Sequence, residues 1–178
     1  MKVRTGKNVL KRSGPFAGTD AERLEDLQGM TDDHNIKAVF CSRGGYGAFK
    51  IVTSADFSAL RKYPKWYVGF SDITVLHLWL SEVMGIVSLH GDMPLNYSDP
   101  DKTDETFLTL HDALFGNFRP IGWEGRIVRN TGAEGELTGG NLSLIYSLMG
   151  TKAEPATNGK ILFIEEVGEY YYHLDRMM

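Results

Sequence analysis

Apolar residues between positions 35 and 91 alternate between short continuous runs and stretches with helical spacing. The runs at 37–42, 65–70 and 86–91 predict buried β-strands, because they are short and bounded by polar or turn-forming residues. The stretches at 46–63 and 72–84 predict helices, the first as two short ones. Alternating strands and helices favour a parallel sheet, and such sheets carry ligands beyond the carboxyl ends of their strands.

The flanking segments extend this pattern and divide the chain. Residues 18–30 predict a helix capped by Thr19 or Asp20, and residues 103–116 predict another that closes at Gly116. Residues 117–141 are rich in glycine and polar residues, with short β-type pieces; a short helix at 142–150 and a strong strand at 159–167 follow. We therefore expect an α/β domain over 1–118, a linker over 119–134 and a second unit over 135–178.

Composition and charge then narrow the class of protein. The 178 residues are 42% hydrophobic with a net charge of −4, and the basic residues are scattered, which argues against nucleic-acid binding. No window approaches the roughly 20 apolar residues of a membrane span, and no signal peptide is evident, so we expect a cytoplasmic protein. The single cysteine, Cys41, excludes an intramolecular disulfide and a cysteine-rich zinc site, and we expect neither metal nor cofactor.

The first candidate for chemistry is Ser71, in the sequence GFSDIT between a predicted strand and a predicted helix. A serine on such a turn can present its hydroxyl clear of the sheet, and the next amide, that of Asp72, can stabilise an oxyanion. The usual pattern is G-x-S-x-G, however, and its last position here is Ile73. The local pattern alone favours the simpler alternative, in which Ser71 or Asp72 only caps the helix.

The second candidate is the loop SRGGYG at 42–47, directly after the first predicted strand. Its glycines, Gly44, Gly45 and Gly47, permit positive φ and close backbone approach, so the loop can offer amides to an anion. It is neither a dinucleotide fingerprint nor a Walker A motif, and a plain glycine turn is the alternative. Neighbouring parallel strands would bring this loop beside Ser71.

Acids and histidines complete the candidates. Glu165 and Glu166 end an apolar strand, and strand alternation places them on opposite faces, so the pattern alone does not choose between them. Of the five histidines, His77 lies within a predicted helix and fits a core or surface role, whereas His90 ends the third strand and could line the site. His34 and His111 are expected at the surface.

Together these segments resemble the LD-carboxypeptidase family of serine peptidases, which includes muramoyltetrapeptide carboxypeptidases and the microcin C self-immunity proteins. The matching motifs are GPFAGTDAERLEDLQGM, KAVFCSRGGYGA, PKWYVGFSDITVLHL, LHGDM, GGNLSLI and ILFIEEVGEYYYHLDRMM, and they span nearly the whole chain in order. The resemblance implies a flavodoxin-like parallel-sheet N-terminal domain and the beginning of a smaller, β-rich C-terminal domain. It also implies an active site between the two, often in a homodimer.

The resemblance also assigns roles. It implies that Ser71 is the nucleophile, that the amides of Asp72 and Gly45 form the oxyanion hole, and that Glu165 is the triad acid. The implied reaction is hydrolysis of the bond to a C-terminal D-alanine in murein tetrapeptides during peptidoglycan recycling. From their positions, the residues expected to contact substrate are Arg43, Gly44, Tyr46, His90 and Asn141.

Two departures from the family pattern qualify the expected activity. Family members carry the catalytic histidine well beyond the glutamate, and they begin with a strand and a helix upstream of Met1. His173 stands where relatives often have arginine. We therefore expect a fragment lacking both ends that cleaves poorly alone. The alternatives are cleavage of a peptidyl-nucleotide antibiotic, and a non-catalytic module that binds an anionic ligand.

Overall fold

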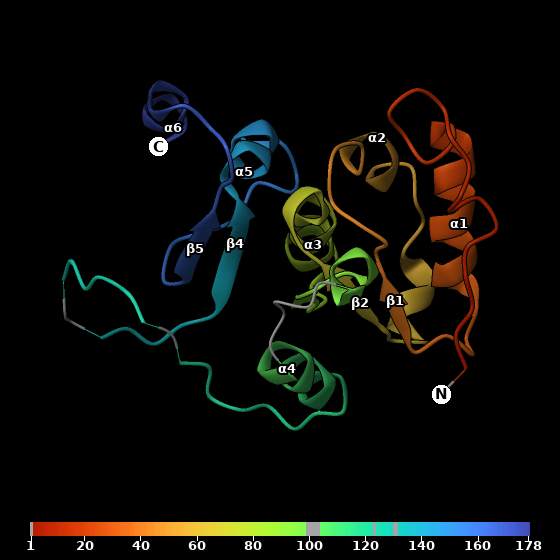
Figure 1. The fold of residues 1–178 in the computed structure, drawn as a ribbon, viewed down its shortest axis with the longest axis horizontal. Coiled ribbons are helices and arrows are strands. Elements are labelled where there is room, and N and C mark those ends of the chain that lie inside the picture. The colour runs from red at the N-terminus through yellow and green to blue at the C-terminus, as the bar shows by residue number, and fades with distance from the viewer. Residues whose placement is uncertain (1, 99–103, 123, 130–131) are drawn as a thin grey trace.

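The computed structural model describes residues 2–98, 104–122, 124–129 and 132–178. It is an α/β structure with two parallel sheets, as the alternating pattern predicts (Figure 1). The first sheet lies toward the N-terminal α1, the second toward the C-terminus, and α3 stands between them (Figure 1). No helix in the described part of the chain is long and apolar enough to cross a membrane.

The first sheet contains the three predicted strands, each shorter than its apolar run. β1 (Ala38–Phe40) pairs in parallel with β2 (Trp66–Gly69), and β2 pairs in parallel with β3 (Leu89–His90). The order β1-β2-β3 places the three carboxyl ends side by side. The expectation that loops following neighbouring strands would meet at one edge is therefore confirmed.

Helices connect these strands as the spacing predicts. The stretch at 46–63 forms two short helices, α2 (Phe49–Val52) and a 3₁₀ helix (Ser58–Arg61). The stretch at 72–84 forms a 3₁₀ turn (Ser71–Ile73), α3 (Thr74–Leu78) and a π-helical turn (Trp79–Val83). A 3₁₀ helix (Pro94–Ser98) follows β3, and α4 (Asp104–Leu114) ends before Gly116, which has φ 79°.

The N-terminal helix α1 (Asp20–Asp32) is fixed at both ends by polar side chains. Thr19 is its N-cap, and it forms a capping box with Glu22, which decides between the two cap candidates. At the other end, Lys65 Nζ donates to the carbonyls of Met30, Thr31 and Asp33 at 2.7–2.9 Å. These bonds satisfy helix carbonyls that would otherwise lack partners and join α1 to the start of β2.

The second sheet contains β4 (Leu137–Asn141) and β5 (Ile161–Glu165), paired in parallel across α5 (Leu142–Leu148). The sequence predicts β5 and α5, but it does not delimit β4 as a strand, and α6 (Tyr171–Met177) was not predicted. The β4 sequence is LTGGN, whose glycines have low strand propensity, so the pairing with β5 makes it a strand.

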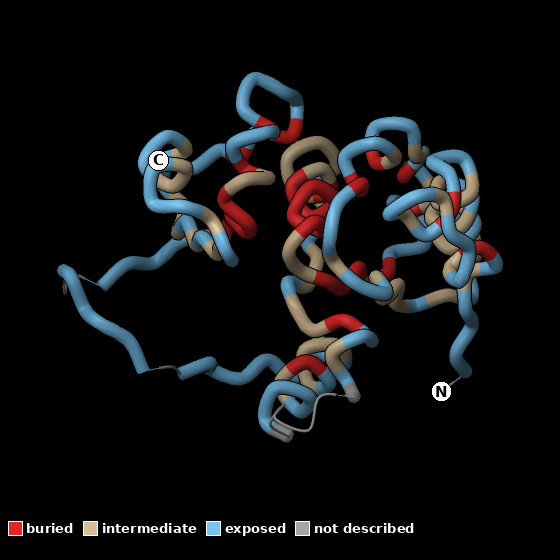
Figure 2. Tube along the Cα trace, turned by 45° about the horizontal axis from the view of Figure 1, so that its top comes forward, coloured by how far each residue is buried: buried red, intermediate tan, exposed pale blue. Residues whose placement is uncertain are grey.

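One hydrophobic core joins the first sheet, α3 and α5. Val75, Leu76 and Leu78 of α3 are buried, and they belong to the same cluster as Ile145 and Leu148 of α5. Figure 2 shows the buried segments concentrated along α3 and the elements facing it. The two units therefore share apolar contacts through α3, and the position of one is coupled to the other.

His77 is a buried titratable group beside this core, and its pKa predicts how stability depends on pH. Its Nε2 donates to the Gly69 carbonyl at 2.9 Å and its Nδ1 accepts from the Ser88 hydroxyl at 2.7 Å, an arrangement that suits the neutral ring. Burial lowers the pKa of His77 from 6.5 to about 4, although the Gly69 carbonyl partly opposes this. Between pH about 4 and about 6.5, His77 is therefore protonated in the unfolded chain but neutral in the folded chain.

We expect the free energy of unfolding to fall as the pH drops from about 6.5 to about 4, with His77 contributing up to about 3 kcal/mol. Urea titrations at several pH values measure this slope. His77→Gln should reduce this slope, while His34→Gln, at an exposed ring that lies tilted against Tyr63, should not change it. An identical slope in His77→Gln would contradict the assignment.

Candidate functional site

Ser71 occupies a strained turn at the carboxyl end of β2. Its φ is 62°, and in the described part of the chain it is the one non-glycine residue with positive φ. Such a conformation costs a side-chain-bearing residue about 1–3 kcal/mol and persists only where the surroundings enforce it. The residue starts the 3₁₀ turn that leads into α3, so it sits on a sharp strand-to-helix turn as a nucleophile elbow requires.

The glycine loop of residues 42–47 packs directly against this serine. A Cβ built on Gly44 would lie 2.9 Å from Ser71 Cβ and 3.1 Å from its Oγ. Gly45 and Gly47 have φ values of 124° and 127°, which side-chain-bearing residues rarely adopt. The predicted approach of this loop to Ser71 is confirmed, and it depends on backbone that only glycine supplies without strain.

The Asp72 side chain fixes the far end of this loop. Its Oδ2 accepts from the Ala48 amide at 2.8 Å, at the start of α2. Its Oδ1 is buried without a hydrogen-bond partner among the described residues. Burial raises the pKa of this carboxyl, opposed by the amides of Ala48 and Gly47 and then by the charge of Arg23. The Asp72 side chain therefore holds the loop in place. The Asp72 backbone amide takes no part in that contact and remains a candidate for the oxyanion hole beside Ser71.

The two C-terminal acids have separate partners, as strand alternation predicts. Glu165 Oε1 accepts from the Ser71 amide at 3.0 Å. Glu166 instead accepts from Asn141 Nδ2 at 3.1 Å and from the Ser143 amide at 3.0 Å. Burial raises the pKa of the Glu165 carboxyl; the bond from Ser71 opposes this, and the charge of Glu166 adds to it. Of the two acids, Glu165 is the one in contact with the serine.

A contact between β4 and α3 brings Glu165 to this position. The Asn141 amide donates to Thr74 Oγ1 at 2.9 Å, and Asn141 stands opposite Glu165 in the parallel pair. A Cβ on Gly140 would lie 2.4 Å from Thr74 Oγ1, so only glycine permits this approach. The sequence analysis did not identify Thr74, because its partner lies 67 positions away and no local signal marks the pair.

The remaining predicted contact residues are dispersed. Arg43 is exposed, with its Nε donating to the Gly44 carbonyl at 3.3 Å. Tyr46 is 66% exposed, and its ring lies 6.0 Å from that of Phe16. Asn141 is buried and caps α5 through the Leu144 amide, so its side chain is engaged in the fold. The structure gives Asn141 a capping role that the sequence analysis did not foresee.

His90 lies among aromatic rings at the end of β3. Its ring centre is 4.9 Å from that of Phe163 and 6.0 Å from that of Phe70. Burial lowers its pKa. Among the described residues no hydrogen bond joins Ser71 Oγ to a histidine, and His173 instead bonds Glu169 Oε2 at 2.5 Å through its Nδ1. Within the described part of the chain, the serine therefore has an acid bonded to its backbone amide but no histidine bonded to its hydroxyl.

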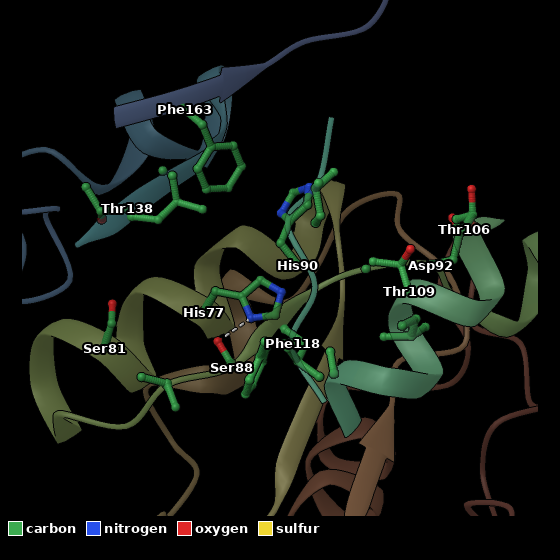
Figure 3. A pocket seen from close by; sticks show the side chains of 18 of the residues that line it. His77, Ser81, Ser88, His90, Asp92, Thr106, Thr109, Phe118, Thr138 and Phe163 are labelled. Carbon is green, nitrogen blue, oxygen red and sulfur yellow. Dashed lines mark hydrogen bonds between the residues drawn. The ribbon is translucent and has the colours of Figure 1, made fainter. Parts of the chain in front are cut away.

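A cavity of about 700 Å³ lies between β3, α4 and β4, and His90 and Phe163 are at its border (Figure 3). Neither Ser71 nor Glu165 lines it. The His77–Ser88 hydrogen bond is on one of its walls, and Thr106 and Thr109 of α4 are on another (Figure 3). The cavity is thus adjacent to the serine site but separate from it. The described residues hold no cluster of three metal-ligating side chains.

Comparison with known families assigns both parts of the chain. Residues 1–91 match the LD-carboxypeptidase N-terminal domain, and residues 134–178 match the LD-carboxypeptidase C-terminal domain. The chain belongs to the LD-carboxypeptidase family. Ser71 and the glycine loop fall in the first matched part of the chain, and Glu165 falls in the second.

Individual relatives agree with this assignment. A probable murein peptide carboxypeptidase of Bacillus subtilis is 38% identical over 189 residues, covering 100% of this chain and 57% of the relative. A murein tetrapeptide carboxypeptidase of Pseudomonas aeruginosa is 34% identical over 183 residues, covering 97% of this chain and 59% of the relative. The chain therefore spans less than two thirds of the length of these relatives.

Solved structures share the fold. A muramoyltetrapeptide carboxypeptidase from Oxalobacter formigenes superposes with a TM-score of 0.83 at 31% identity, over 95% of this chain and 58% of that one. The self-immunity protein MccF, in complex with glutamyl sulfamoyl guanosine, superposes with a TM-score of 0.81 at 22% identity, over 97% of this chain and 61% of that one. At that identity the second likeness concerns the fold alone.

Proposed function

We propose that this chain carries the nucleophile and acid of a serine-type LD-carboxypeptidase, which releases the C-terminal D-alanine of murein tetrapeptides during peptidoglycan recycling. The observation that carries the proposal is the strained turn at Ser71, packed against the glycine loop and bonded to Glu165. A residue that only caps a helix needs neither a positive φ nor close contact with a glycine loop. The cap alternative therefore does not explain these two features of Ser71. The names of the relatives supply the substrate class.

In the proposed mechanism Ser71 Oγ attacks the carbonyl carbon of the bond to D-alanine and loses its proton to a general base. The oxyanion is stabilised by the amides of Asp72 and Gly45, since the Ser71 amide is already engaged by Glu165. The tetrahedral intermediate collapses to an acyl-serine and free D-alanine as the leaving amine takes a proton. Water, activated by the same base, then hydrolyses the acyl-serine.

The general base in this proposal lies outside residues 1–178. His77 is neutral and saturated by Gly69 and Ser88, and His173 is bound to Glu169. His34 and His111 are exposed and contact Tyr63 and Asp112 respectively. The His90 ring packs between those of Phe70 and Phe163, and no hydrogen bond among the described residues joins it to Ser71. Without a base the serine stays protonated at neutral pH, so we expect residues 1–178 alone to turn over at least about 10³-fold more slowly than the whole protein.

The test is release of D-alanine from a murein tetrapeptide by the whole protein and by residues 1–178 in parallel. The same peptide ending in L-alanine serves as the control for stereochemistry. Turnover of a peptidyl-nucleotide instead of the muropeptide would move the assignment to the antibiotic-cleaving alternative. Binding of the muropeptide without turnover by the whole protein would favour the non-catalytic module.

Glu165 and Glu166 provide a matched pair for this proposal. Glu165→Gln keeps an oxygen for the Ser71 amide but removes the charge, so we expect activity of the whole protein to fall about 10²-fold or more with stability within about 1 kcal/mol of wild type. Glu166→Gln weakens charge-assisted bonds to Asn141 and Ser143, so we expect about 1–2 kcal/mol lower stability and smaller losses of activity. The reverse pattern in kinetics and urea unfolding would assign the triad role to Glu166.

A further inference from the structure

The loop that abuts Ser71 needs restraint that its own sequence does not provide. Gly44, Gly45 and Gly47 lie within four consecutive positions, and glycine loses more backbone entropy on ordering than any other residue. One restraint is Asp72, whose carboxylate accepts the Ala48 amide at 2.8 Å. Backbone bonds also hold its two ends: the Ser42 carbonyl accepts from the Leu95 amide at 3.2 Å, and the Gly47 carbonyl accepts from the Lys50 amide at 3.1 Å. The peptide groups between these ends can still rotate, because glycine has few steric barriers.

Arg23 of α1 also holds this loop, from a different part of the chain than Asp72. Its Nη1 donates to the Gly47 carbonyl at 3.0 Å, and its Nη2 donates to Asp20 Oδ1 at 2.5 Å. The guanidinium carbon lies 5.1 Å from the centre of the Phe16 ring, and the side chain is only 14% exposed. A Cβ on Gly47 would lie 2.6 Å from Nη1, which shows how closely the guanidinium packs on the loop backbone.

The stability of α1 explains only part of the placement of Arg23, through its ion pair with Asp20 three residues earlier. Arg23 ends the first turn of the helix, where the helix dipole disfavours a positive charge. Its Nε is buried without a hydrogen-bond partner among the described residues, a defect that costs about 1–3 kcal/mol. Both features lower stability and the ion pair with Asp20 offsets part of that cost, whereas the bond to Gly47 is directed at the loop beside Ser71.

We propose that Arg23 is a positioning residue for the oxyanion loop: it holds the Gly47 carbonyl while Asp72 holds the Ala48 amide, and together they fix residues 44–47 against Ser71. The inference rests on the proposed function, because it gives the fixed loop a catalytic purpose. Arg23 is not in contact with Ser71 and acts through Gly47. Its loss therefore changes where the loop amides point and leaves the nucleophile in place.

The experiment compares Arg23→Met and Arg23→Lys with wild type. Methionine keeps an apolar stem over Phe16 and removes the donors, while lysine keeps one charged donor. Lys11→Met is the matched control, because Lys11 bonds Glu22 in the same turn of α1 at 2.6 Å and does not reach the loop. Amide hydrogen exchange of the whole protein reports loop order, and its kcat and KM report catalysis.

In Arg23→Met we expect the amides of residues 45–48 to exchange about tenfold faster or more, with kcat lowered about 10–100-fold and KM within about twofold of wild type. Arg23→Lys should recover part of both effects, and Lys11→Met should show neither. If Arg23 only stabilised α1, its replacement would lower the denaturant midpoint of unfolding but would not lower kcat while leaving KM nearly unchanged.

Unchanged exchange of residues 45–48 in Arg23→Met would overturn the proposal, and so would faster exchange with wild-type kcat. If the wild-type whole protein releases no D-alanine from any peptide, the proposed function fails on its own. Faster exchange in Arg23→Met would even then support the restraint of the loop by Arg23. The two failures are thus distinguishable.

Discussion

Ser71→Ala is expected to abolish D-alanine release by the whole protein, with a loss of about 10³-fold or more in kcat, because no other described hydroxyl occupies the turn after β2. The fold should survive, since the backbone strain is unchanged and the lost hydroxyl is small. Release of D-alanine, followed by chromatography of the muropeptide products, measures the effect.

Ser71→Gly separates chemistry from folding. Glycine adopts a φ of 62° without strain, so we expect this variant to be as inactive as Ser71→Ala and as stable as wild type, or more stable by up to about 1 kcal/mol. Ser54→Ala, at an exposed serine of the loop after α2, is the control and should leave both quantities unchanged. Substantial turnover by either Ser71 variant would refute the nucleophile assignment.

Gly140→Ala is expected to destabilise the protein by about 3 kcal/mol or more. The new Cβ would lie 2.4 Å from Thr74 Oγ1, and the φ of 138° is itself unfavourable for alanine. Relief of this clash requires the end of β4 to move from α3, and Glu165 moves with it because it pairs with Asn141. Activity should therefore fall together with stability. Urea unfolding and D-alanine release measure the two effects.

Gly150→Ala is the matched control for this prediction. Gly150 also has positive φ, 77°, but nothing lies within 4 Å of a Cβ built there. We expect it to cost only about 1 kcal/mol, from the backbone strain alone. Equal losses in the two variants would show that the approach of β4 to Thr74 contributes nothing beyond strain.

The two predictions depend on one structural property, the shared position of the two sheets around α3. Ser71 precedes α3, and Thr74 at its start receives the amide of Asn141 from β4. The serine and the acid therefore reach one place because one helix contacts both sheets. This arrangement explains how residues 94 positions apart, Ser71 and Glu165, are hydrogen-bonded.

Local pattern predicted the elements that bury continuous apolar runs. The strands at 38–40, 66–69 and 161–165 and the capped helix at 20–32 follow from burial and capping that a short window displays. It did not delimit β4, whose LTGGN sequence becomes a strand only by pairing with β5, nor α6, whose YYHLDRM sequence has no buried residue. Pairing across the fold is invisible in a window of a few residues.

The sequence by itself determined the α/β class, the order of the first sheet's elements and the identity of the glycine loop that would face Ser71. Strand alternation left Glu165 and Glu166 open, and the family resemblance implied Glu165. The tertiary structure shows Glu165 as the serine's neighbour, and it alone gave Asn141 a capping role and placed Arg23 on the loop. The physical reason is separation along the sequence. The spacing of neighbouring residues indicates which side chains are buried and where helices are capped, whereas a hydrogen bond between distant residues depends on how whole helices and strands pack.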